Sequence, residues 1–277
     1  MTSRTSAPLT VASLVELTAR ALGVPARPTT VDGLVAGDGG AAVRGVVVTT
    51  MATFEVLEHA VAVGANVVVT HEPLYYDHLG RATADLERED DPVYAAKRAF
   101  VGDHGIAVWR YHDAWHDRRP DGIDEGAADA LGWSLDPGAA AAGAALCDVG
   151  PTTLAELAAH VARALGSDAA RYVGDPALPV RRVALDLGFR GFARNRGLLR
   201  RTDVDAVVVG EAHEWETGGY AADAARLLGR GLVVVGHVPS EQAGMALFAE
   251  WLGALLRDAA PDVDVSFVPT PDAYAPA

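Results

Sequence analysis

Three short runs made mostly of β-branched and other apolar residues, at 66–70, 106–109 and 232–235, are each followed by a histidine and a carboxylate. Runs of this length predict strands that are buried on both faces of an α/β sheet. Ligands of such sheets collect at the carboxyl ends of the strands. The pattern therefore predicts that His71, His112 and His237 approach a common kind of site, a sheet edge rich in imidazole and carboxylate groups.

Segments with helical spacing lie between the predicted strands. Thr10 can cap a helix over 10–23, Thr152 or Thr153 one that runs to about 165, and Ser240 the last helix of the chain. The charged stretch 76–91 has no clean period and is interpreted as a loop. The remaining predicted elements are strands at 45–49, 181–186, 205–209 and 263–267, and helices at 53–63, 92–103, 191–200 and 217–229.

The order of these elements predicts an α/β protein of two modules. A stretch rich in Pro, Gly and Ala at 136–150 is the best candidate boundary. We expect a first module of residues 1–135 and 231–277, a second of 136–230, and a metal site at strand carboxyl ends between them. Segments starting at Val43 and Val180 follow a similar order of elements, which indicates either a duplicated module or two ordinary αβ units.

Composition excludes several classes of function. The net charge of −14 argues against a nucleic-acid partner, because such binding relies on clustered Lys and Arg. Lys97 is the only lysine and Cys147 the only cysteine, so Schiff-base chemistry has one candidate residue and no intramolecular disulfide can form. No stretch of about 18 apolar residues and no apolar leader occur, so we expect a cytoplasmic protein without a membrane partner.

Several motifs resemble those of the Nif-three-like family, whose members are described as dinuclear-metal-centre proteins and type 2 GTP cyclohydrolase I homologues. The stretch 70–74, Thr-His-Glu-Pro-Leu, is similar to the family's T-H-H-P-L, and 236–241 to its G-H-x-x-T-E element. Residues 105–116 match a segment that ends H-T-N-L-D, and Gly210-Glu211 matches T-G-E. The family's W-D-N-x-G-L element is reduced to Val-Asp-Gly-Leu at 31–34, and its G-G-S-G turn to 187–191.

Position by position, the resemblance implies metal ligands at His71, Glu72, His116, His237 and Glu241. Glu72 stands where the family has histidine, and His116 where it has aspartate. The set therefore keeps three histidines and two carboxylates, with one of each exchanged. Asp113 and Asp117 are the substitutes if the match shifts by a residue, and Glu211 occupies the strand-end position equivalent to His71 in the repeat.

Two classes of function follow. The first is a metal-dependent hydrolase of a small molecule of unknown identity. It would hold two divalent ions per subunit (Zn, Fe or Mn), with His112 as a catalytic acid or base. The second is a non-catalytic protein that binds or delivers a metal or serves as a scaffold. The resemblance implies a homohexamer in either case. Tyr75, Tyr76 and Trp115 flank the predicted site, either as pocket walls or as core residues.

Overall fold

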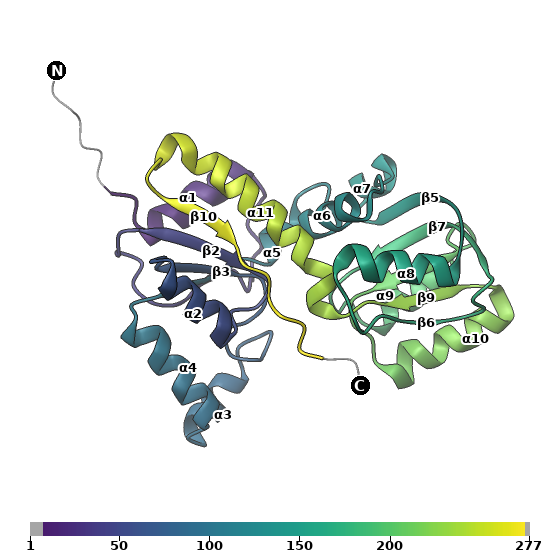
Figure 1. The fold of residues 1–277 in the computed structure, drawn as a ribbon, viewed down its shortest axis with the longest axis horizontal. Helices are drawn as coiled ribbons and strands as arrows, with labels where there is room; N and C mark the ends of the chain where they lie inside the picture. Colours follow the sequence, from purple (N-terminus) through teal and green to yellow (C-terminus); the bar gives the residue numbers. More distant parts are fainter. Residues whose placement is uncertain (1–7, 275–277) are drawn as a thin grey trace. The chain divides into compact units, whose positions relative to one another are not determined.

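A computed structural model describes residues 8–274, which form two compact α/β units. The first unit runs to Arg118 and takes up Met245–Thr270. The second comprises Arg119–Gly244 and begins again at Pro271. Each unit contains its own five-stranded sheet (Figure 1).

The sheet of the first unit has the order β1-β4-β3-β2-β10. Neighbouring strands are parallel except for β1, which runs antiparallel to β4. Parallel strands ending at one edge bring Thr49, Thr70 and Arg110 into register, and the segments that follow β3 and β4 carry the candidate ligands. The strands are β1 (Gly33–Ala36), β2 (Gly45–Thr49), β3 (Val67–Thr70), β4 (Ala107–Arg110) and β10 (Asp264–Phe267).

Alternate residues of these strands face two separate cores. Val47, Val68 and Val108 pack with α2, and Trp109 contacts Phe248 on the opposite face. Figure 1 shows α2 on one side of the sheet and α1 on the other. Burial on both faces explains why the strands are continuous β-branched runs. The helices are α1 (Val11–Leu22), α2 (Phe54–Ala62), α3 (Ala82–Arg88), α4 (Pro92–Asp103), α5 (Asp113–Asp117) and the part of α11 (His237–Ala259) from Met245 onward.

The sheet of the second unit has the order β5-β7-β8-β9-β6, with a parallel centre and an antiparallel strand at each edge. A capping box formed by Thr153 and Glu156 starts α8. The strands are β5 (Ala145–Thr153), β6 (Arg171–Val173), β7 (Pro179–Asp186), β8 (Ala206–Val209) and β9 (Gly231–Val234). The helices are α6 (Gly122–Leu131), α7 (Pro137–Ala141), α8 (Leu154–Leu165), α9 (Phe192–Leu199), α10 (Gly219–Leu228), the π-helical turn η1 (Glu214–Gly218) and the start of α11.

The structure places the unit boundary elsewhere than the Pro-, Gly- and Ala-rich stretch 136–150. That stretch contains α7 and most of β5, which pairs with β7, so it lies inside the second unit. Strand β9 pairs with β8, so residues 231–234 also belong to the second unit. Backbone pairing decides both points, and composition gives no information about it.

Two local expectations also differ from the structure. The stretch 76–91 contains the helix α3, in which none of the residues is buried, so it has no apolar stripe to signal it. The last helix begins at His237 rather than at Ser240, because Pro239 is tolerated in the first helical turn, where its missing N–H is not needed.

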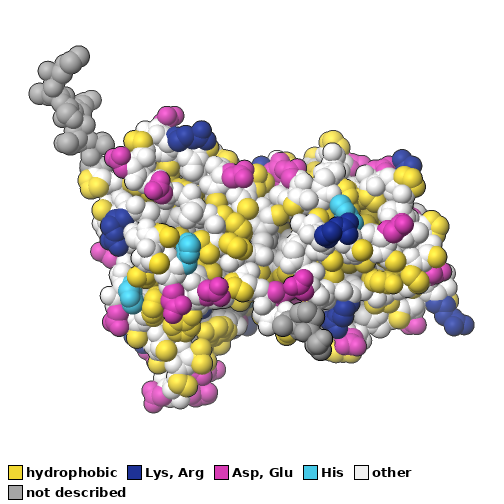
Figure 2. Space-filling view, viewed as in Figure 1, with side chains coloured by type: hydrophobic (Ala, Val, Ile, Leu, Met, Phe, Trp, Pro, Cys, Tyr) yellow, Lys and Arg dark blue, Asp and Glu magenta, His cyan; other side chains and the backbone are white. Residues whose placement is uncertain are grey.

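Charged side chains are scattered over the described surface. On the face seen in Figure 2, the basic residues stand singly or in small groups among acidic and apolar ones. Among residues 8–274, no helix combines the length and the apolar character that crossing a bilayer requires.

Candidate metal centre

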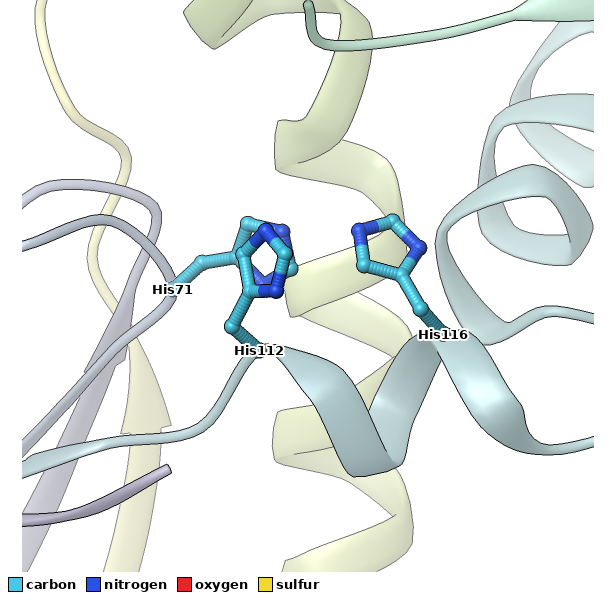
Figure 3. Close-up of side chains that lie close together, drawn as sticks. All are labelled: His71, His112 and His116. Atoms are coloured by element: carbon cyan, nitrogen blue, oxygen red, sulfur yellow. The ribbon is translucent and has the colours of Figure 1, made fainter. Parts of the chain in front are cut away.

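Three histidines converge in the first unit, just past the carboxyl ends of β3 and β4. His71 follows β3, while His112 precedes α5 and His116 lies on it (Figure 3). Each ring offers a nitrogen that lies within 4.8 Å of the nitrogens offered by the other two. The ring centroids are 4.5 Å apart for His71 and His112, 5.0 Å for His71 and His116, and 4.7 Å for His112 and His116. This three-histidine cluster is compact enough to hold one cation.

Asp32 fixes the start of α5. One of its carboxylate oxygens accepts the backbone N–H groups of His112 and Asp113 at 2.7 and 2.8 Å, and the other accepts that of Ala114 at 2.8 Å. These are N–H groups that a helix start leaves without an intrahelical partner, and a carboxylate there also matches the helix dipole. Asp32 is part of the shortened 31–34 motif, and its role is to position the segment that carries His112 and His116.

Asp113 orients the ring of His112. Its Oδ1 lies 3.0 Å from Nδ1 of His112, and Arg27, Thr30 and the Val31 N–H also contact the carboxylate. Burial acts to raise the pKa of Asp113, but these partners outweigh it and the pKa is lowered. An ionised carboxylate on Nδ1 selects the tautomer that has its lone pair on Nε2, an arrangement common behind metal-bound histidines.

His112 itself is held neutral. Burial is the main cause that lowers its pKa to about 4, and the neighbouring His116 adds to the effect. A neutral imidazole has a lone pair for a cation or for a proton.

His71 is oriented in the same way. Its Nδ1 lies 3.3 Å from the carbonyl oxygen of Tyr111, which selects the tautomer with the proton on Nδ1 and the lone pair on Nε2. Two of the three rings are thus set from behind by an acceptor, and each has its lone pair on the nitrogen away from that acceptor.

Glu72 forms a second group with His112 and His78, whose candidate ligand atoms also lie within 4.8 Å of one another. The glutamate oxygens lie 4.0 Å from Nε2 of His112 and 3.6 Å from Nη2 of Arg110. Arg110 is buried and donates to the carbonyl oxygens of His71 and His78 and to Nδ1 of His78. His78 with an accepting Nδ1 carries its proton on Nε2, so in this arrangement it is a poorer cation ligand than the other histidines.

The second unit has its own cluster of Glu211, His237 and Glu241. Glu211 lies 2.9 Å from Nδ1 of His237, and a Glu241 oxygen lies 3.4 Å from the Nε2 of the same ring. Ser240 accepts the N–H of Gly188 at 3.0 Å and donates to the His237 carbonyl, which ties the turn after β7 to the start of α11. A Cβ at Gly188 would lie 2.2 Å from Oε1 of Glu241, so only glycine fits there.

The structure therefore groups the sequence-predicted residues in two sets. It brings His71, His116 and the predicted catalytic residue His112 together, with Glu72 beside His112. His237 and Glu241 lie in the other unit, where Glu211 joins them. Asp113 and Asp117 were the alternative ligands. Asp117 pairs with Arg27 at 2.6 Å, and the oxygens of Asp113 accept from Thr30 and His112, so both carboxylates are engaged with other residues.

Sequence reasoning missed His78 and the role of Asp32. His78 lies in the charged stretch 76–91, where no periodicity or motif marks it. Asp32 belongs to the Val-Asp-Gly-Leu stretch at 31–34, and the resemblance of that stretch to the family's W-D-N-x-G-L element was the available signal. Of the flanking aromatics, Trp115 is core, packed on Phe248, whereas Tyr75 lines a cavity.

The donor chemistry of both clusters fits a divalent cation. Imidazole nitrogens and carboxylate oxygens are the ligands of zinc, iron and manganese sites, and the three-histidine cluster supplies three neighbouring nitrogens.

Comparison with known proteins gives a consistent picture. A family model described as Duf34/NIF3 (NGG1p interacting factor 3) matches residues 26–273. None of the curated proteins matches the chain. The Staphylococcus aureus protein SA1388 is 17% identical, with a TM-score of 0.78 over 98% of this chain and 100% of its own.

A Bacillus cereus protein related to NIF3 is 16% identical, with a TM-score of 0.76 over 98% of this chain and 100% of its own. The protein ybgI, of unknown function, is 22% identical, with a TM-score of 0.72 over 95% of this chain and 99% of its own. These likenesses show a shared fold. Because the family model matches residues 26–273, most of the 277-residue chain, the chain belongs to the Duf34/NIF3 family.

Proposed function

We propose that this protein is a metal-dependent hydrolase that uses a pair of divalent cations, held by His71, Glu72 and His116 in the first unit and by His237 and Glu241 in the second. The observation that carries the proposal is the three-histidine cluster, in which His71 and His116 are the proposed ligands and His112 lies beside them, with Tyr111 and Asp113 orienting the rings of His71 and His112. A bound cation of this kind supplies a hydroxide near neutral pH and polarises the bond under attack.

His112 is the residue we propose to accept and return the proton. The carboxylate of Asp113 lies at its Nδ1, so Nε2 is the basic atom, and the carboxylate of Glu72 lies 4.0 Å from that atom. An imidazolium formed on His112 would be stabilised by both carboxylates. Buried Arg110 holds the carbonyl oxygens of His71 and His78 and thereby keeps the loop that carries His71 and Glu72 in place.

Metal analysis of the purified protein tests the ligand set. We expect loss of bound metal in Glu72→His and in His116→Asp, and recovery in the double variant, because a shared site couples the two positions. His104→Gln is the matched control, since His104 is exposed and lies outside the candidate metal groups. If both single variants keep the metal content of the wild type, Glu72 and His116 are not ligands.

A turnover screen of the metal-loaded protein against nucleotides and cyclic amides tests the catalytic part. His112→Gln that keeps its metal and loses turnover supports proton transfer by His112, whereas loss of the metal makes His112 a ligand. Full metal content without turnover on any substrate of the screen would favour the non-catalytic alternative, a protein that binds or delivers the cation.

We further propose a homohexamer. Support comes from large apolar side chains on the second unit that are exposed in the single chain, chiefly Trp215 at 79% and Leu227 at 76%. Light scattering at micromolar concentration should give six times the 28.8 kDa mass of one chain, and a 28.8 kDa particle or any smaller multiple would contradict the proposal.

A further inference from the structure

The first unit contains a cavity of about 1000 Å³ beside the three-histidine cluster. Arg110 and Asp113, which contact His71 and His112, line one part of it. Tyr94 and Arg98, one turn apart on α4, line another part together with Tyr75. A cavity of this size accommodates a small organic molecule, and the residues that contact the candidate metal ligands lie in its lining.

Three residues that line this cavity, Tyr75, Tyr94 and Arg98, have side-chain hydrogen-bond donors available for a ligand. Among the described residues, the hydroxyl groups of Tyr75 and Tyr94 make no hydrogen bond, although the Tyr94 side chain is buried and the two rings pack edge to face at 4.8 Å. Arg98 donates from Nη1 to Oε1 of Glu87 at 2.6 Å, and this is the one hydrogen bond that its side chain makes within residues 8–274. Both tyrosines lie near enough to influence the pKa of Arg98, which is raised chiefly by Glu87.

Two of the carboxylates around the cavity, Asp77 and Asp113, are held by several hydrogen bonds, whereas a third, Glu87, is held by one exposed ion pair. Asp77 accepts backbone N–H groups of its own loop, and Asp113 accepts from His112 and from the segment around Thr30. Glu87 has an exposed side chain and pairs with the equally exposed Arg98. An exposed ion pair of this kind contributes little to stability, so another anion can displace Glu87 from the guanidinium.

We propose that Arg98, Tyr75 and Tyr94 form an anion subsite that binds a carboxylate or phosphate group of the substrate, whose apolar body lies against Leu74, Leu79 and Val101. A guanidinium and two hydroxyls match the acceptor oxygens of such a group, and hydrogen bonds to a charged acceptor are the strong ones. That the bound molecule is a substrate rests on the proposed function. The subsite narrows the substrate class to small anionic molecules with an apolar or aromatic body.

Binding of benzoate and of phenyl phosphate, measured by calorimetry or ligand-observed NMR, tests the subsite. Phenol serves as the neutral probe with the same ring. The measurement is made on the protein as purified and again after chelation, because an anion could otherwise bind to a cation. We expect benzoate, phenyl phosphate or both to bind in both preparations and phenol to bind at least tenfold more weakly, and the relative affinities identify the preferred anion.

Variants distinguish the subsite from nonspecific charge. Arg98→Gln should weaken anion binding at least tenfold, and the Tyr75→Phe, Tyr94→Phe pair several-fold. Glu87→Gln should strengthen it, because the competing carboxylate is gone. Arg88→Gln is the matched control: Arg88 lies on the adjacent α3, pairs with Asp85 at 2.5 Å and does not line the cavity.

Equal anion affinities of the Arg98→Gln and Arg88→Gln variants, weaker binding in Glu87→Gln, or anion binding that disappears on chelation would each overturn the subsite. Chelated protein lacks the proposed catalytic cation, so anion binding in that preparation is independent of the hydrolase proposal. Loss of turnover without loss of anion binding would fault the proposed function and leave the subsite standing.

Discussion

Replacing Asp32 by alanine tests how the fold positions the candidate metal ligands His112 and His116. The change removes the acceptor of three backbone N–H groups at the start of α5. A net contribution of about 0.5–1.5 kcal/mol for each hydrogen bond gives a sum of roughly 1.5–4.5 kcal/mol. Water can replace part of the lost acceptor because Asp32 is half-buried, so we expect a loss near the middle, about 2–3 kcal/mol, comparable with or somewhat above a typical cap.

Denaturant unfolding of chelated protein measures this loss. Three of the five tryptophans, Trp109, Trp115 and Trp251, belong to the first unit. Replacing Trp133 and Trp215 by Phe therefore makes the fluorescence report on the first unit alone, which matters because two units need not unfold together. Asp38→Ala is the matched control, since Asp38 accepts one N–H in an exposed turn.

The same variant should bind metal more weakly. Partners that orient the ligands typically change metal affinity by about 10–100-fold, and α5 with its cap carries both His112 and His116. Asp32→Asn, which keeps one acceptor oxygen, should lie between the wild type and Asp32→Ala in stability and in metal affinity. If Asp32→Ala unfolds at the same denaturant concentration as Asp38→Ala and keeps its metal affinity, Asp32 does not position the cluster.

Two further changes test the second unit and the buried lysine. Gly188→Ala should weaken cation binding at Glu211, His237 and Glu241 at least tenfold in calorimetry. The new Cβ would meet Glu241, and the backbone at residue 188 has φ +66°. Gly197→Ala is the control and should leave cation binding unchanged, because its Cβ meets nothing within 4 Å. Burial lowers the pKa of Lys97 from 10.5 to about 8. Between pH 8 and pH 10.5 the unfolded chain therefore binds a proton at Lys97 that the folded chain lacks. The free energy of unfolding rises with pH over this interval by up to about 3 kcal/mol. Lys97→Met should remove this rise in denaturant midpoints measured at pH 7.5 and 10, and an unchanged pH dependence would show that Lys97 is not the source.

The sequence by itself determined the local elements and the kind of chemistry. The strands β3, β4 and β9 were predicted to within about a residue, because strands buried on both faces must be β-branched along their whole length. The cap at Thr10 was predicted because a helix start needs an acceptor for its first N–H groups. For the helix that ends at about 165 the sequence left Thr152 and Thr153 open, and Thr153 is the cap. Histidine and carboxylate after such strands indicated a cation site, because parallel strands expose their carboxyl ends at one edge.

Tertiary structure alone decided which of these residues meet. His71 and His116 lie 45 residues apart in the sequence but meet in one group with His112, and Glu72 meets His78 beside the same His112. Asp32 reaches His112 across 80 residues, and β9 joins the second sheet by pairing with β8. Hydrophobic periodicity reports which face of an element is buried and carries no information about the partner that covers it, so contacts distant in sequence require the folded chain.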